Sequence, residues 1–177
     1  MSFSHLVMTL QHLSVITQLN SHSLMSNIIQ ARDLSQQPPR SPRVKIGGYP
    51  LLARALDKGR ADLAGTVGEY HFDCPLDNYL FDFKQVKGAD VKDLLAKGAT
   101  DEEVAKWLDT HGTPRTAEEI AGFAAQVEAA RPYDMPEKKQ WFIDNCATVG
   151  IDPAKSTLFD FLEADDAAVA RQHAVAS

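Results

Sequence analysis

The chain has 177 residues, a formal net charge of −6, and 44% hydrophobic and 24% charged residues. This length suits one domain with its own core, and the composition excludes disordered and fibrous proteins. No stretch reaches the roughly 20 apolar residues that a membrane-spanning helix needs. Two cysteines, Cys74 and Cys146, are too few for a disulfide framework, so we expect a reducing, cytoplasmic location.

Residues 1–24 form a leader that contains no Lys, Arg, Asp or Glu. It lacks the basic segment of a secretory signal and the basic face of a helix that binds a membrane surface. Met25 opens a more conventional start, directly before a basic segment. We interpret the leader as an upstream extension or a poorly ordered helix, and we expect no membrane partner.

Residues 25–49 are predicted to form an extended basic arm, because four prolines and a Gly-Gly pair between residues 35 and 50 exclude a continuous helix. From Arg32 to Arg60, seven basic residues stand against two acidic ones, whereas residues 61–177 carry 11 basic and 22 acidic residues. Our first interpretation is that the arm folds onto the acidic helices of its own domain. A polyanion-binding arm and a proline-rich docking motif are the alternatives. The overall negative charge argues against nucleic acid as the main partner.

Residues 50–166 are predicted to form a single helical domain, since apolar residues recur at helical spacing between glycines and prolines. The first helix follows Pro50, and the poorly periodic residues 66–80 allow only a short extended piece before Pro75 breaks it. Further helical patterns follow in chain order at residues 89–97, 101–112, 117–131, 136–149 and 158–162.

Two of these helices begin with a capping box, Thr100 with Glu103 and Thr116 with Glu119. The pattern lacks the alternation of strands and helices that marks an α/β fold. It predicts an all-α irregular bundle of five or six short helices, followed by an acidic, alanine-rich, solvated tail that contains Asp165 and Asp166, with residues 167–177 outside the domain.

Several strings of the sequence are similar to one family. They are ARDL at 31–34, PPRSPR at 38–43, DKGRA at 57–61, GTVGEY at 65–70, CPLD at 74–77, DEEV at 101–104 with Trp107, and LFDFL at 158–162 with Asp165 and Asp166. On these strings the chain resembles the uncharacterised bacterial domain-of-unknown-function family 5069, over residues 30–166. The resemblance implies a family label and carries no activity or catalytic residues with it.

The densest group of reactive side chains lies between Lys58 and Asp77. A nucleophilic site needs a thiolate, a base within hydrogen-bond reach and a group that orients the base. The residues of suitable type are Cys74, His71, Tyr70 and Asp77. Lys58 or Arg60 would favour the thiolate. The alternative is a buried Cys74 that fixes the turn at Pro75, because free cysteines are commonly buried and inert.

A second candidate site is a cluster of cations that would bind an anionic small molecule or the carboxylates of a protein partner. Its candidate residues are Arg54, Lys58 and Arg60, with Glu69 nearby. No metal site and no cofactor are predicted, since His71 and Cys74 lack a second Cys/His pair and the glycines lack the spacing of a phosphate-binding loop. Cys146 lies on an apolar stripe and is assigned to the core, and His111 is assigned to a helix end.

These observations leave three functional hypotheses. The first is a non-catalytic binding or regulatory module that uses the surface between the arm and residues 54–77. The second is an enzyme or redox-responsive protein centred on Cys74. The third is a small oligomeric scaffold, in which Phe159 and Phe161 would be exposed at an interface. The sequence leaves the oligomeric state open.

Overall fold

The computed structural model describes residues 31–176, with side chains as far as Arg171, so the leader and the start of the arm lie outside the described residues. Seven α-helices and one 3-10 helix are present there, and the only β-type pairing in this range is an isolated bridge between Ile46 and Tyr49. The helices are α2 (Leu52–Ala64), α3 (Pro75–Lys84), α4 (Gly88–Ala96), α5 (Asp101–His111), α6 (Ala117–Glu128), η1 (Pro132–Asp134), α7 (Pro136–Val149) and α8 (Leu158–Ala176). The predicted all-α class is confirmed. Over this range no helix combines the length and the apolar character needed to cross a membrane.

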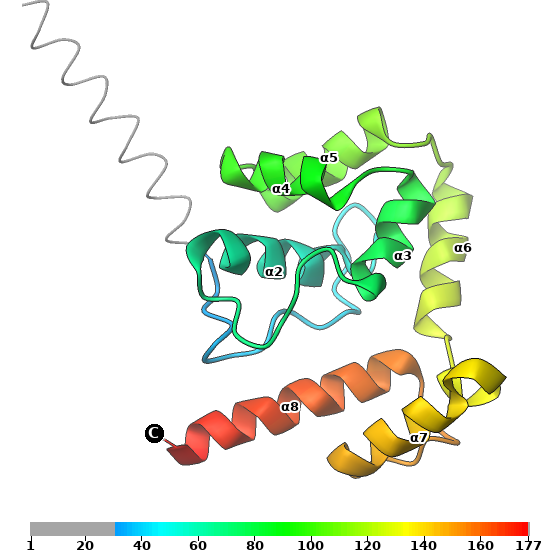
Figure 1. Cartoon of the computed structure of the whole chain (residues 1–177). Helices are drawn as coiled ribbons and strands as arrows, with labels where there is room; N and C mark the ends of the chain where they lie inside the picture. The colour runs from blue at the N-terminus through cyan, green and yellow to red at the C-terminus, as the bar shows by residue number, and fades with distance from the viewer. Residues whose placement is uncertain (1–30, 177) are drawn as a thin grey trace, which may run out of the picture.

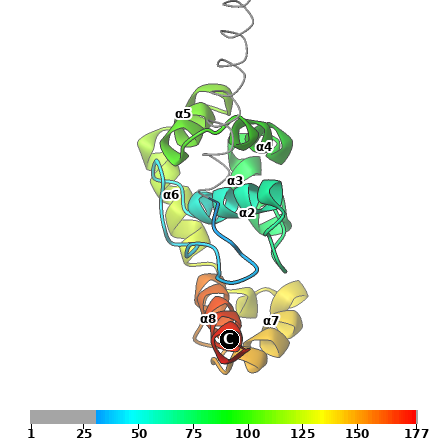
Figure 2. The ribbon, with the colours of Figure 1, turned by 90° about the vertical axis from the view of Figure 1, so that its left-hand side faces the viewer.

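The helices lie in three tiers (Figures 1 and 2). Helices α4 and α5 form the upper tier, α2 and α3 form the middle one, and the pair α7 and α8 lies below them. Helix α6 runs along one side and connects the upper tier to the lower one (Figure 1). The long helix α8 therefore passes beneath α2 (Figures 1 and 2).

The main core joins the upper and middle tiers. Its fully buried side chains come from the arm and from five of the helices, and they include Tyr49, Leu52, Leu56, Phe81, Val91 and Leu108. The helical members occupy the apolar faces of their helices, and burying these faces is the main favourable term in folding. The Tyr49 hydroxyl donates a hydrogen bond to Asp109 at 2.6 Å, so the polar end of this buried ring is satisfied.

A second, smaller core holds the lower tier together. Phe142 and Cys146 from α7 pack against Phe161 from α8, and the Phe142 and Phe161 rings meet edge to face with centroids 6.0 Å apart. The assignment of Cys146 to the core is confirmed. The expectation that Phe159 and Phe161 are exposed is wrong, because both are buried, and it no longer supports an oligomeric scaffold.

Three of the helix ends predicted from specific residues are confirmed. Both predicted capping boxes are present, at the starts of α5 and α6. His111 ends α5, where its ring stacks on Trp107 with centroids 4.9 Å apart. Two other ends differ from the prediction. Pro75 begins helix α3 instead of breaking an extended piece, and α8 continues to Ala176, through most of the segment expected to be a solvated tail.

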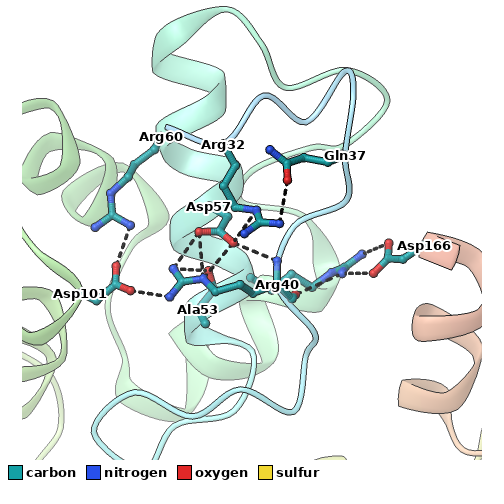
Figure 3. A network of polar contacts seen from close by, with 9 residues as sticks. Arg32, Gln37, Arg40, Ala53, Asp57, Arg60, Asp101 and Asp166 are labelled. Carbon is teal, nitrogen blue, oxygen red and sulfur yellow. Dashed lines mark hydrogen bonds and ion pairs between the residues drawn. The ribbon is translucent and has the colours of Figure 1, made fainter. Parts of the chain in front are cut away.

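The arm lies on the helices of its own domain, as its charge pattern predicts. Arg40 donates hydrogen bonds to Asp57 on α2 at 2.7 Å and to Asp101 on α5 at 2.6 Å. Arg60 reaches the other Asp101 oxygen at 2.6 Å, and Figure 3 shows how the three elements meet. Asp101 thus links the arm to α2 and α5.

Two further cations fasten the arm to the remaining helices. Arg43 pairs with Asp160 on α8 at 2.5 Å, and Lys45 pairs with Glu128 on α6 at 2.8 Å. The basic residues of the arm are therefore largely committed to carboxylates of the same chain.

The network around Asp101 predicts how the fold responds to acid. Partial burial favours protonation of its carboxyl, but hydrogen bonds from Arg40 and Arg60 outweigh burial and lower its pKa. A carboxyl with a lowered pKa stabilises the fold at neutral pH, and this contribution is lost as the pH falls through the folded-state value. We expect Asp101→Asn to lower the free energy of unfolding by about 1–2 kcal/mol at pH 7, and the difference from the wild type to shrink below about pH 4. Urea unfolding at several pH values measures this, and a difference that does not change with pH would contradict it.

Candidate functional site

A groove of about 1040 Å³ runs between the middle tier and the α7–α8 pair. Its walls come from the arm, α2, the loop at residues 65–74, α3, α6, α7 and α8. Small-molecule sites commonly enclose roughly 300–1,000 Å³. The groove is therefore large enough for a small organic molecule.

Most of the groove is apolar. Three helices supply its main apolar side chains, which are Leu76 and Phe83 from α3, Phe123 and Val127 from α6, and Leu158, Leu162 and Val169 from α8. The half-exposed rings of Tyr79 and Trp141 border the same space. Lys138 donates a hydrogen bond to the Tyr79 hydroxyl at 2.8 Å, which links α7 to α3 across the groove.

Most of the ionisable side chains gather where α2 and the loop before α3 line the groove. Lys58 Nζ lies 2.7 Å from Asp77 Oδ1, and it also donates a hydrogen bond to Cys74 Sγ at 3.2 Å. The Lys58 and Asp77 side chains are only 3% and 1% exposed. Burial raises the pKa of the Asp77 carboxyl, and the Lys58 ammonium only partly offsets this effect.

Cys74 occupies the position just before the first turn of α3. It is half-buried, and it lines the groove together with Lys58. Among the described residues, the amides of Leu76 and Asp77 in that first turn have no acceptor. Free amides at a helix start attract negative charge, because the helix dipole adds a partial positive charge there.

A second buried ion pair connects α2 to α8. Arg54 donates two hydrogen bonds to the Asp166 carboxylate, at 2.5 and 3.0 Å, and both side chains are nearly buried. The Tyr70 hydroxyl donates a third, at 3.0 Å, to Asp166 Oδ1, and burial together with Asp166 raises the pKa of Tyr70. Burial and the neighbouring Asp166 likewise raise the pKa of Asp165, which lines the groove. Figure 3 shows Asp166 facing α2 and the arm.

The structure brings most of the predicted site residues to one place and separates one from the rest. Six of them line the groove: Arg54, Lys58, Glu69, Tyr70, His71 and Cys74. Asp77 lies behind this surface as the partner of Lys58. Arg60 lies elsewhere, paired with Asp101 beside the arm, so the predicted cluster of three cations does not form.

The candidate nucleophile has a different neighbour from the one that the sequence suggests. The contact of the Cys74 sulfur is Lys58, and no hydrogen bond joins it to His71 or Tyr70 among the described residues. Asp77 orients Lys58 instead of a histidine. Cys74 lies 16 positions from Lys58 in the chain, and only the packing of α3 against α2 brings the two side chains together.

Sequence patterns miss the side chains that α7 and α8 contribute. The sequence places Asp166 beside a solvated tail, yet it is 6% exposed and forms the pair with Arg54. Lys138 and Trp141 carry no sequence signal of a site, because isolated polar and aromatic residues are common on amphipathic helices. The one usable signal is the apolar spacing of residues 158–169, which continues past the expected end of the helix.

The backbone beside the groove is strained at two places. Leu51, which lines the groove, has φ 69° at the residue before α2, and Asp73 has φ 58° directly before Cys74. A left-handed conformation at a bulky residue such as Leu costs on the order of 1–2 kcal/mol and persists only where packing imposes it. Such strain is concentrated at functional sites, and here it adjoins the segments that carry Arg54 and Cys74.

The donor set of the groove fits an organic ligand better than a metal. Among the side chains that the structure describes, residues 31–171, no three from His, Cys, Asp or Glu are arranged to hold a metal ion. The buried carboxylates near the groove already accept hydrogen bonds or ion pairs from Lys58 and Arg54.

Comparison with known families agrees with the strings recognised in the sequence. The model of the family described as Domain of unknown function (DUF5069) matches residues 36–168, about three quarters of the chain. A comparison with curated proteins finds none that matches. The matched range contains Lys58, Cys74 and Asp77, both members of the Arg54–Asp166 pair, and the helices that wall the groove except for the second half of α8. The chain belongs to the family described as Domain of unknown function (DUF5069).

Proposed function

We propose that the protein is a binding module for a small amphiphile, a molecule with an apolar body and one anionic head. The observation that carries this proposal is the groove itself, about 1040 Å³ and mainly apolar, with most of its ionisable side chains gathered on α2 and the loop before α3. Sites for small molecules combine an apolar lining with a few polar groups in the same way.

The head group is assigned to the start of α3. Lys58, the partner of Asp77, supplies a nearly buried positive charge there, and the free amide of Leu76, which lines the groove, adds the partial charge of the helix start. A carboxylate is the simplest head that these donors accept. The apolar body would then lie between α3, α6 and α8, where Val127 and Leu162 contribute to the walls.

The ion pairs favour a small ligand over a large acidic partner. Arg54 is committed to Asp166 and Arg60 to Asp101, whereas Lys58, the partner of Asp77, also contacts the Cys74 sulfur at the groove. An extended acidic surface would need several free cations at the protein surface, whereas a single head group needs only one local donor set.

A cytoplasmic, bacterial setting is part of the proposal. Cys74 and Cys146 are both free thiols, which suits a reducing compartment. The strings shared with a bacterial family point to the same setting. In this location a binding module of this kind would carry or sense a metabolite. The molecule that the ligand-bound protein contacts would then determine its regulatory role.

Calorimetric titration with dodecanoate tests the proposal. We expect saturable binding of one dodecanoate per chain, and we expect Ala130→Phe to weaken it about tenfold or more, because the new ring occupies the groove wall where Ala130 lies. Ala121→Phe is the matched control: it adds the same ring to an exposed position of α6 outside the groove, and it should leave the affinity unchanged. Equal affinities for all three proteins, or no binding to the wild type, would refute the proposal.

A further inference from the structure

The contact between Lys58 and Cys74 gives the groove a feature that binding alone does not need. The Lys58 side chain is 3% exposed, its ammonium lies 3.2 Å from the Cys74 sulfur, and Cys74 itself lines the groove. An ammonium in this position can stabilise negative charge that develops on or beside the sulfur during a reaction. Cys146 offers the contrast within the same chain, because it is fully buried among apolar side chains and burial raises its pKa.

From this arrangement we propose that Cys74 is an acyl-acceptor site: it takes the acyl group from a thioester whose apolar chain occupies the groove. This inference rests on the proposed binding function and names the activated form of the same ligand class. The geometry supplies three requirements of acyl transfer together, namely a nucleophile, donors for a developing oxyanion, and an apolar space for the chain.

The proposed step needs no oxidant and no further reactant. The Cys74 thiolate attacks the carbonyl carbon of the thioester, and a new carbon–sulfur bond forms. The carbonyl oxygen becomes an oxyanion, which Lys58 and the free amide of Leu76 can stabilise. The bond between the carbonyl carbon and the carrier sulfur then breaks, and the carrier leaves as a thiolate that takes a proton from water. The product is an S-acyl Cys74 whose chain lies in the groove.

Lys58 is a positioning residue as well as an oxyanion donor, since Asp77 fixes its ammonium at 2.7 Å. The step therefore predicts a chain-length dependence that a merely exposed thiol would not show. A long acyl chain is bound and delivered by the groove, whereas an acetyl group gains little from it.

The test uses the full chain and a simple thioester, S-dodecanoyl-N-acetylcysteamine. Intact-mass and peptide mass spectrometry should show one dodecanoyl group on Cys74, none on Cys146, and its removal by neutral hydroxylamine. We expect the acetyl thioester to react about tenfold more slowly or worse, and free dodecanoate to inhibit the reaction by competition. Cys74→Ser should abolish the adduct in a protein whose circular dichroism shows that it is folded. Cys146→Ala, which removes the other thiol, should leave the adduct in place.

Several results would overturn the inference. Equal labelling of Cys146, equal rates for the acetyl and dodecanoyl thioesters, or the same rate in urea-unfolded protein would each show an unassisted thiol. Dodecanoate binding in the groove without any adduct would refute acyl transfer and leave the proposed function standing. An adduct that free dodecanoate fails to inhibit would show that the groove does not deliver the chain.

Discussion

Replacing Asp166 by Ala is expected to lower the free energy of unfolding by about 3–5 kcal/mol, because the change leaves the buried Arg54 guanidinium without its counter-charge. It also removes the acceptor of the Tyr70 hydroxyl. Both partners of Asp166 lie outside α8, so the loss should be accompanied by loosening of that helix. Equilibrium urea unfolding measures the stability, and hydrogen exchange of the α8 amides measures the loosening.

A double variant separates the ion pair from simple packing. Arg54→Met combined with Asp166→Leu replaces both charges by apolar side chains, and such replacements of a buried pair are often neutral or stabilising. We therefore expect the double variant to be more stable than Asp166→Ala by about 2 kcal/mol or more. If the double variant is as unstable as the single one, Arg54 and Asp166 contribute through shape and not through charge.

Replacing Asp77 by Ala should cost a comparable amount, about 3–5 kcal/mol, since Lys58 would become a buried charge without a partner. The change also tests whether Asp77 holds Lys58 against the sulfur: a lower reactivity of Cys74 toward the dodecanoyl thioester shows that it does, and a higher reactivity shows that the carboxylate only competes for the Lys58 charge. Urea unfolding and the acylation rate measure the two effects separately.

Asp82 provides the control for Asp77 on the same helix. It is an exposed carboxylate on α3 with no ion pair among the described residues, so Asp82→Ala should change the stability by less than about 0.5 kcal/mol. If both variants lose the same free energy of unfolding, the Lys58–Asp77 pair contributes no more to stability than an exposed carboxylate on α3 does.

The sequence is sufficient for the fold class because its signals are local. A capping box such as Thr100 with Glu103 involves only four consecutive residues. In the same way, the spacing of apolar residues in α2 and α5 determines which faces of these helices are buried. Pro75 is ambiguous in the sequence because a proline both ends an extended segment and begins a helix, and the residues that follow it decide between the two.

The site can be predicted only in part, since its key contacts are not local. Lys58 and Cys74 are both recognisable as candidates, but their pairing depends on how α3 packs against α2. The contribution of α8 cannot be predicted for the same reason. The sequence indicates a solvated Asp166, because its partner Arg54 lies 112 positions away in the chain. Arg60 shows the converse, because its nearness to Lys58 in sequence does not bring it to the groove.

The two tryptophans allow the most direct test of the central claim, that an amphiphile lies in the groove. Trp141 borders the groove, whereas Trp107 lies on α5 in the upper tier and packs against the main core (Figure 1). A dibrominated stearate quenches tryptophan fluorescence only at close range. We expect it to quench Trp141 strongly in the Trp107→Phe variant and to leave Trp107 unaffected in the Trp141→Phe variant. Equal quenching of the two residues, or quenching of Trp107 alone, would contradict the assignment of the groove as the binding site.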